Sequence, residues 1–153
     1  MARFTAVVRT PAPADRTWRL LTDWPAHGRW VPLTVVTVQT PDGRGLGARF
    51  NGRTGVGPLA FDDPMEVVEW QEPVAGVPGR VALAKHGRVV LGGAEIEVED
   101  IPGGGSVVRW TEDVQLVPVA LTRPFDRVVA ALGRRAFERA LRAMARELAA
   151  PAR

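Results

Sequence analysis

Few side chains in this sequence combine the residue type and the spacing that a known chemistry requires. His27 and His86 stand far apart and form no HExxH or HxxH motif, and the chain has no cysteine, which argues against a structural zinc site. Ser106, the single serine, follows a run of glycines instead of occupying a GxSxG elbow, so a serine-hydrolase triad lacks its nucleophile. We therefore expect no metal ion and no other cofactor.

The glycine-bearing and acidic segments also lack a functional spacing. GRGLG and GVG match no Walker loop and open no helix after a strand, so we expect no nucleotide site. Asp62 and Asp63 are predicted to lie on a turn. Glu95, Glu97 and Glu99 are predicted on the outer face of a strand, so both groups are expected to be solvated.

One carboxylate, Glu112, has a different setting. If the last hairpin turns near Gly104, Glu99 lies opposite Arg109 on the outer face. The inner face then carries Ala94, Ile96 and Val98 against Val114, Glu112 and Trp110. A carboxylate in this apolar row needs a hydrogen-bond partner or a raised pKa, which makes Glu112 the first candidate for a polar contact inside a pocket. The alternative is a structural role, either near the open end of the sheet or in an ion pair with an arginine.

His86 is a second and weaker candidate for acid or base chemistry. It stands beside Gly87 at a predicted turn, where a solvated side chain is more common than a general base. The chain has no tyrosine, which removes a common phenolic acid. The catalytic residues are therefore unknown, with Glu112 and His86 as weak candidates.

A long amphipathic helix over about residues 124–149 is predicted to lie beside these side chains. Thr122 is the expected N-cap, Pro124 suits the first turn, and Asp126 stands where the helix dipole favours an anion. The apolar residues recur at steps of three and four and form one stripe, which comprises Phe125, Val129, Leu132, Ala136, Phe137, Ala140, Leu141, Met144 and Leu148.

Seven strands and two short helices are predicted before that helix. A first strand at 4–9 precedes a short helix at 14–22 and a second short helix or tight turn in DWPAHGRWVP. Further strands are expected at 34–39, 48–54, 65–70, 80–85, 89–100 and 107–117. Short turns favour an antiparallel meander, so we predict an α+β fold in which a curved sheet grips the long helix. Gly52, Gly92 and Gly93 lie inside strands, where such a sheet could bend.

The composition predicts one domain over residues 1–153. No signal peptide and no apolar stretch of about 20 residues is apparent, so we expect a soluble, cytoplasmic protein without a transmembrane segment. The net charge of +3 is small, and an arginine-bearing helix face must be solvated in any case, so no nucleic-acid partner is expected. The oligomeric state is left open between a monomer and a homodimer.

Several motifs carry a resemblance to a known family. They are APADRTWRLLTDW and HGRWVP near the start, GARFNGRTGVGPLAFDDPMEVVEW in the middle, and VVRWTEDV before the last helix. With the order of elements, they resemble the START/birch-pollen-allergen-like (SRPBCC) superfamily and its polyketide cyclase/dehydrase and lipid transport group. The resemblance spans essentially the whole chain and implies a helix-grip fold with a cavity between sheet and helix. It implies no particular reaction, because the group shares a cavity and not a catalytic motif.

The resemblance also indicates which side chains meet a ligand. It places Trp30 and His27 on the segment that closes one end of the cavity, where large amphipathic rings can contact a hydrophobic ligand, although a plug beneath a loop is the alternative. The expected ligand-binding residues are Trp30, His27, Trp110, Glu112, Ile96, Met65, Phe137, Leu141 and Met144. Whether Asn51 and Arg53 or Phe50 and Gly52 face inward is left open.

Three functions are consistent with this sequence. The first, which we favour, is binding of a small hydrophobic molecule, such as a lipid, an isoprenoid or a polyketide, in the cavity. The second is an enzyme resembling aromatase/cyclases, which acts through pocket shape and one acid or base. The third is an interaction protein whose arginine-rich outer helix face contacts a protein, an RNA or an anionic membrane.

Overall fold

The computed structural model describes residues 1–151. Its helices and strands are β1 (Ala2–Thr10), α1 (Ala14–Leu21), η1 (Trp24–Arg29), β2 (Thr34–Val38), β3 (Arg49–Thr54), η2 (Gly57–Leu59), β4 (Phe61–Gln71), β5 (Gly79–His86), β6 (Val90–Asp100), β7 (Ser106–Leu116), α2 (Val119–Thr122), η3 (Arg123–Phe125) and α3 (Asp126–Ala149). None of the helices within these residues is long and apolar enough to cross a membrane.

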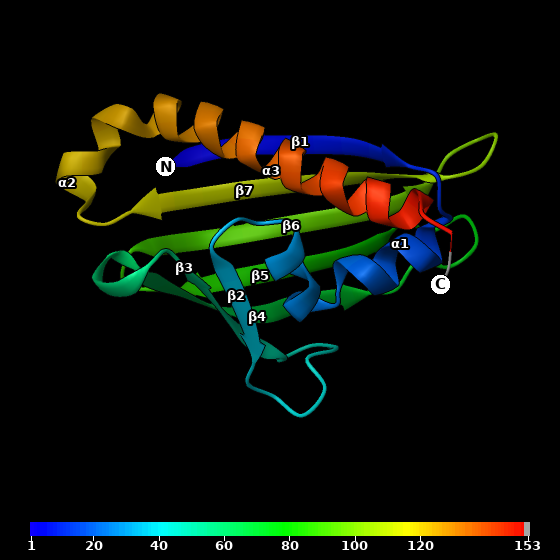
Figure 1. Cartoon of the computed structure of the whole chain (residues 1–153), viewed down its shortest axis with the longest axis horizontal. Helices are drawn as coiled ribbons and strands as arrows, with labels where there is room; N and C mark the ends of the chain where they lie inside the picture. The colour runs from blue at the N-terminus through cyan, green and yellow to red at the C-terminus, as the bar shows by residue number, and fades with distance from the viewer. Residues whose placement is uncertain (152–153) are drawn as a thin grey trace.

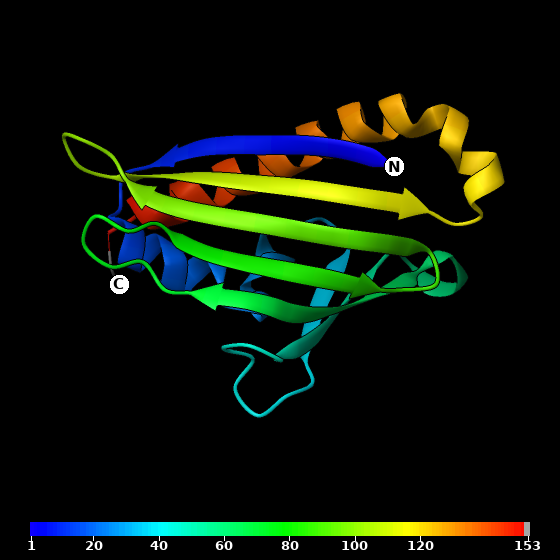
Figure 2. The same ribbon diagram turned by 180° about the vertical axis from the view of Figure 1, so that it is seen from behind.

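The strands form a single antiparallel sheet in the order β1-β7-β6-β5-β4-β3-β2. Figure 1 shows α3 lying along one face of this curved sheet, with α1 beside its C-terminal half. Figure 2, from behind, shows that no helix of the described chain covers the other face of the sheet. The predicted α+β helix-grip fold is confirmed, including the two short helical segments after the first strand.

The start of the long helix differs from the prediction. Two short turns, α2 and η3, precede α3, and Thr122 stands before η3 without a capping hydrogen bond from its side chain. Its hydroxyl instead donates to the Leu116 carbonyl at 2.6 Å, which ties the end of β7 to the helical turns. Asp126 does lie in the first turn of α3, where its carboxylate also pairs with the Met1 ammonium at 2.9 Å. Three members of the predicted apolar stripe, Phe125, Leu132 and Ala136, are exposed.

The last hairpin pairs two residues away from the predicted register. Glu97 lies opposite Arg109, and Glu112 lies opposite Ala94. A shift of two residues preserves the face of each side chain, because side chains alternate with a period of two along a strand. Glu112 therefore points inward as expected, and Arg109 still reaches Glu99 across the diagonal at 2.6 Å.

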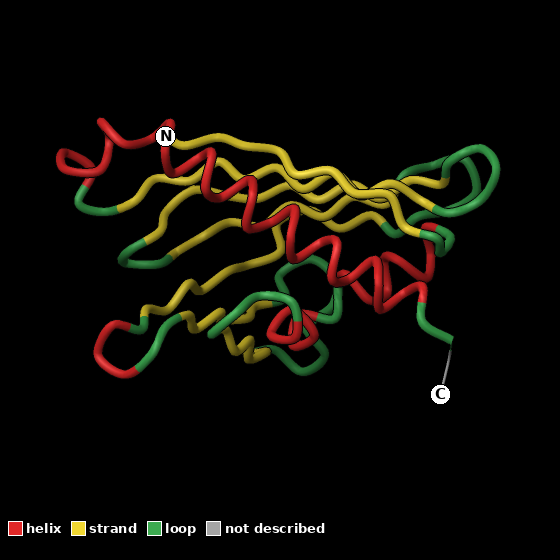
Figure 3. Tube along the Cα trace, turned by 45° about the horizontal axis from the view of Figure 1, so that its top comes forward, coloured by secondary structure: helices red, strands yellow, loops and turns green. Residues whose placement is uncertain are grey.

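Large side chains fill one end of the space between sheet and helix, which we call the filled end. Trp18 and Leu21 of α1 and Trp24 of η1 are almost completely buried there. They share one core cluster with Met144 and Leu148 from the C-terminal half of α3. Figure 3 shows the shorter helical segments on the same face of the sheet as α3. The opposite end, near α2 and η2, has no such insertion among residues 1–151.

Candidate functional site

A cavity of about 420 Å³ lies between the sheet and the N-terminal half of α3, at what we call the hollow end. Its walls are mostly apolar and come from both the sheet and the helix. The lining residues are Phe4, His27, Trp30, Val31, Thr34, Val36, Gly52, Thr54, Phe61, Asp63, Met65, Lys85, Val90, Trp110, Glu112, Val114, Leu116, Val129, Gly133, Phe137, Ala140 and Leu141.

Two glycines shape this end of the space between sheet and helix. Gly52 of β3 lies on the inner face of its strand, and a methyl group added there would meet only ordinary contacts, the nearest being the Met65 methyl group at 3.6 Å. Gly133 of α3 lets the helix approach β1, because a side chain at this position would collide with the Phe4 ring. The helix therefore rests on β1, while the strands farther from β1 curve away from it.

Three charged side chains form a buried polar cluster in the cavity wall. Lys85 of β5 donates to Asp63 of β4 at 2.6 Å, and its ammonium lies 3.6 Å from a carboxylate oxygen of Glu112 on β7. The other oxygen of Glu112 accepts a hydrogen bond from the Trp110 indole at 2.8 Å. Asp63 keeps one buried oxygen that has no partner among the described residues.

The surroundings of the cluster shift the pKa values of Glu112 and Lys85. Burial raises the pKa of Glu112, and the nearby Lys85 ammonium and Trp110 indole only partly oppose this effect. Burial would lower the pKa of Lys85, but the carboxylates of Glu112 and Asp63 outweigh it and keep the pKa above its usual value. The cluster thus contains a Lys85–Asp63 ion pair beside Glu112, whose carboxyl group has a raised pKa.

His27 contributes a neutral ring to the same wall. One ring nitrogen lies 2.7 Å from the Leu21 carbonyl, an acceptor, so this nitrogen carries the proton. Burial lowers the pKa of His27, although the Leu21 carbonyl partly offsets it. The ring also contacts three tryptophans, Trp24, Trp30 and Trp110, at centroid distances of 5.3 to 5.6 Å. A neutral imidazole in this setting suits contact with an uncharged ligand.

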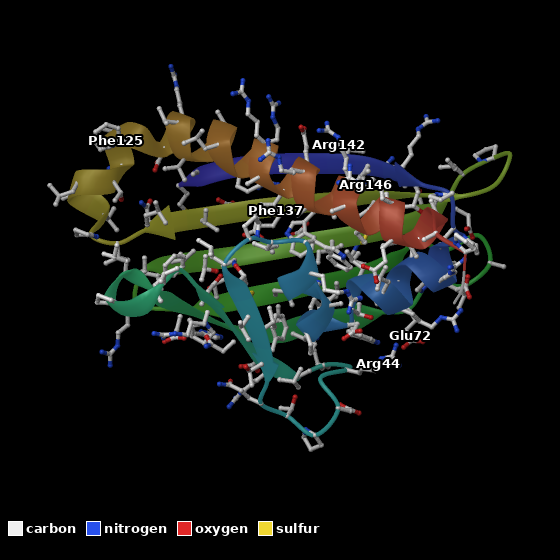
Figure 4. The ribbon with its side chains drawn as sticks, viewed as in Figure 1. Arg44, Glu72, Phe125, Phe137, Arg142 and Arg146 are labelled. Atoms are coloured by element: carbon white, nitrogen blue, oxygen red, sulfur yellow. The ribbon has the colours of Figure 1, made fainter. Side chains whose placement is uncertain are left out.

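Trp30 separates the cavity from a groove on the outside of the molecule. The groove has a volume of about 300 Å³ and shares Trp30, Val31, Phe137 and Ala140 with the cavity. The Trp30 indole donates to Glu147 of α3 at 2.8 Å. This hydrogen bond links the segment after η1 to α3 and fixes Trp30 between the cavity and the outer groove. Phe137 of α3, labelled in Figure 4, also borders both spaces.

Comparison with known proteins identifies the family. The sequence matches the family described as polyketide cyclase/dehydrase and lipid transport over residues 1–149. The chain belongs to this family. No curated protein matches the sequence at a significant level.

Solved structures resemble the chain in fold. TTHA0849 from Thermus thermophilus is 18% identical, with 96% of this chain and 97% of that chain covered and a TM-score of 0.72. A START superfamily protein from Mycobacterium smegmatis is 16% identical, with 95% and 98% covered and a TM-score of 0.70. A hypothetical protein from Helicobacter pylori, jhp0584, is 14% identical, with 95% and 86% covered and a TM-score of 0.74. At these identities the likeness shows a START-like fold only.

Most of the side chains predicted to meet a ligand line the cavity of this polyketide cyclase/dehydrase and lipid transport family member. Ile96 and Met144 do not, because both are completely buried in the core outside the cavity lining. His86 also lies elsewhere, since it ends β5 with an exposed side chain 3.8 Å from Glu66. The structure brings Glu112 to the cavity and leaves His86 outside it.

The inward face of β3 and the place of the paired aspartates are now defined. Phe50 is buried and Gly52 lines the cavity, whereas Asn51 points outward and donates to Asp62. The prediction that both aspartates are solvated on a turn was wrong for Asp63. Both residues belong to β4, which begins earlier than predicted, and alternation along the strand turns Asp63 inward.

Sequence reasoning missed Lys85 and Asp63 as members of the site. A signal for Lys85 was present, because it follows Val81 and Leu83 at steps of two and these residues are buried on the inner face. Asp63 has the same relation to Met65 and Val67, but only if the strand extends beyond Pro64. A proline in a strand pattern usually indicates the end of the strand, so the extension of β4 from Pro64 back to Phe61 was not predicted.

Proposed function

We propose that this protein binds a small, largely apolar molecule with one uncharged polar group, such as an oxygenated lipid, an isoprenoid or a polyketide. The observation that supports this proposal best is the cavity itself, whose mostly apolar wall carries one cluster of charged side chains, formed by Lys85, Asp63 and Glu112. Burying roughly 200 Å² of apolar ligand surface would contribute about 5 kcal/mol, so binding in the submillimolar range requires no catalytic residue.

The polar cluster favours an uncharged head group over a charged one. The ammonium of Lys85 is already paired with Asp63 at 2.6 Å, and Glu112 is disposed to hold a proton. A ligand carboxylate or ammonium would add an unpaired charge to this buried cluster, which is costly. A hydroxyl or carbonyl group could exchange hydrogen bonds with Asp63 and Glu112 without adding charge.

The first experiment compares native and denaturing mass spectra of the freshly purified protein. A small molecule that is present only in the native spectrum, with an apolar body and no ionised group, is the expected result. Displacement of the neutral fluorescent probe N-phenyl-1-naphthylamine then compares an alcohol, an acid and an amine of equal chain length. The alcohol should bind most tightly, and equal affinity for all three would contradict the role of the cluster.

A cavity-filling variant tests where the ligand binds. Gly52→Val adds a branched side chain inside the cavity, where its Cβ meets only ordinary contacts. It should lower probe affinity by about tenfold or more, because part of the cavity is filled. Thr37→Val, an exposed change opposite Asn51 on β2, is the control and should leave affinity unchanged. Equal probe binding by both variants would place the ligand elsewhere.

A catalytic function is the second candidate, and the raised pKa of Glu112 in the cavity wall favours it. A carboxyl group whose pKa is raised by burial can act as a proton donor that assists enolisation and loss of water from a keto substrate. Glu112→Gln should then abolish turnover of a poly-β-keto substrate while probe affinity changes little. Unchanged turnover in this variant would exclude Glu112 as the acid or base.

A further inference from the structure

We propose that the hollow end of the molecule docks onto the surface of an anionic lipid bilayer. The docking surface, which we call the rim, is formed by the β3–β4, β5–β6 and β7–α3 connections. Its apolar side chains are Val56 and Leu59 on the first connection and Val119, Leu121, Phe125 and Val128 around α2 and the start of α3. Figure 1 shows η2 and α2 at the same end of the molecule, and Figure 4 shows Phe125 at that end.

Several of the apolar side chains of the rim are strongly exposed. Leu59 is 86% exposed, Leu121 is 71% exposed and Phe125 is 60% exposed. They belong to short 3-10 and helical turns, and none of the three lines the cavity or the outer groove. Apolar side chains gathered on one rim suit the boundary between lipid head groups and acyl chains, which accepts side chains without matching their shape.

Arginines give the rim the charge that an anionic bilayer requires. Arg88, Arg123 and Arg127 stand among the apolar tips, and none forms an ion pair within residues 1–151. The acidic residues at this end, Asp62 and Asp126, are already paired with Arg53 and the Met1 ammonium. The rim therefore presents uncompensated positive charge beside apolar side chains, a combination that binds anionic lipid surfaces.

A second copy of the chain complements this surface poorly. In a twofold dimer the same patch meets itself, so Arg88, Arg123 and Arg127 would face their own counterparts without free carboxylates between them. The rim is also continuous with the cavity. Phe61 and Val90 line the cavity directly after the β3–β4 and β5–β6 connections. A bilayer on the rim would thus lie against the cavity entrance, which goes beyond ligand binding by assigning the place where a ligand could be exchanged.

Vesicle sedimentation tests the proposal with the full-length protein. Vesicles of phosphatidylglycerol and phosphatidylcholine should retain the protein, and vesicles of phosphatidylcholine alone should retain much less. Leu121→Asp should weaken binding by about tenfold or more. Leu46→Asp changes a leucine of similar exposure, 74%, in the loop before β3 and is the matched control. Arg123→Gln and Arg127→Gln should each weaken binding by about fivefold, with the effect confined to anionic vesicles.

The outcomes separate docking from the other possibilities. Equal sedimentation of Leu121→Asp and Leu46→Asp, or no preference for anionic vesicles, would overturn the proposal. Concentration-dependent dimers that Leu121→Asp abolishes, without vesicle binding by the native protein, would assign the rim to a second copy instead. Binding of N-phenyl-1-naphthylamine without vesicles is measured in parallel. Its absence in the native protein would count against the proposed ligand function, whereas vesicle binding alone decides the docking proposal.

Discussion

The two ends of the grip use the same sheet and helix in different ways. At the filled end, Trp18, Trp24 and Met144 occupy the space between the layers, so packing holds that end together. At the hollow end no inserted helix of the described chain fills the space, and charged side chains of β4, β5 and β7 meet in the cavity wall. The comparison shows that the position of α1 and η1 is one cause of the cavity, because they fill only one end of the space between sheet and helix.

Polar contacts at the two ends also differ in kind. The filled end joins three hydroxyl groups, those of Thr10, Thr17 and Ser106, at 2.9 to 3.0 Å. These groups are uncharged and satisfy one another, so they add no electrostatic cost to the core. The hollow end instead buries an ammonium between Asp63 and Glu112. Burying charged groups is costly even when they are paired, so the hollow end carries an electrostatic cost that the filled end avoids.

The largest predicted effect on stability comes from removing the Lys85 ammonium, which lies between Asp63 and Glu112 at the hollow end. Lys85→Met should lower the free energy of unfolding by about 3–5 kcal/mol, because it leaves two buried carboxyl groups facing each other without a cation. Urea denaturation measures this change. Adding Asp63→Asn and Glu112→Gln to the same variant should restore most of the loss. A loss below about 1 kcal/mol in Lys85→Met would show that the cluster contributes little to the hollow end.

The second prediction compares the same substitution at both ends. Met144→Ala at the filled end should cost roughly 3 kcal/mol, because it opens a new cavity in a packed core. Met65→Ala at the hollow end should cost roughly 1 kcal/mol, since its side chain already borders empty space. Thermal and urea unfolding of the two variants test this difference. Equal losses would mean that the hollow end is packed as tightly as the filled end.

The faces of the strands and the long helix could be read from the sequence, while the cluster could not. The period of two placed Glu112 and Trp110 inward even though the hairpin register was two residues away. Asp63 escaped because Pro64 interrupts the strand pattern, and its partnership with Lys85 depends on the β4–β5 register across a bulge after Val67. Such register cannot be derived from either strand alone.

The length of the helix could be predicted better than its environment. The periodic stripe continued to Phe125 and Leu132 because these residues keep the helical spacing. Their exposure depends on the sheet, which curves away from the N-terminal half of α3 and leaves the cavity and the rim there. Periodicity marks which residues share a helix face, but it does not show where the opposing layer ends.

The third prediction concerns pH and the ring at the boundary between the two ends. Because the pKa of His27 is lowered in the fold, the unfolded chain binds a proton that the folded chain does not. Stability should therefore fall as the pH drops below about 6.5, until the folded protein also binds the proton. His27→Gln should flatten this part of the profile. His86→Gln, at an exposed site, is the control variant, and an unchanged slope in His27→Gln would contradict the assignment.

The opposite sign is expected for Glu112, which allows the two groups to be separated. Its raised pKa means that the folded protein binds the extra proton, so stability should fall as the pH rises above the ordinary glutamate range. Repeating the pH series with Glu112→Gln should remove this fall and leave the acid-side loss due to His27. Calorimetry over both ranges would thus assign one slope to each residue.

The smallest predicted effect on stability lies at Glu147, which ties Trp30 and Arg29 to α3. The side chain is partly exposed, so Glu147→Gln should change the free energy of unfolding by about 1 kcal/mol or less. Release of the Trp30 indole should nevertheless open the partition between the cavity and the outer groove, which would speed dissociation of N-phenyl-1-naphthylamine in stopped-flow measurements. Glu138→Gln, which removes another carboxylate of the same helix that pairs with Arg134 and Arg142, should not alter that rate. If both variants release the probe at the native rate, the ligand leaves at the rim, and Trp30 belongs to the packing of the filled end.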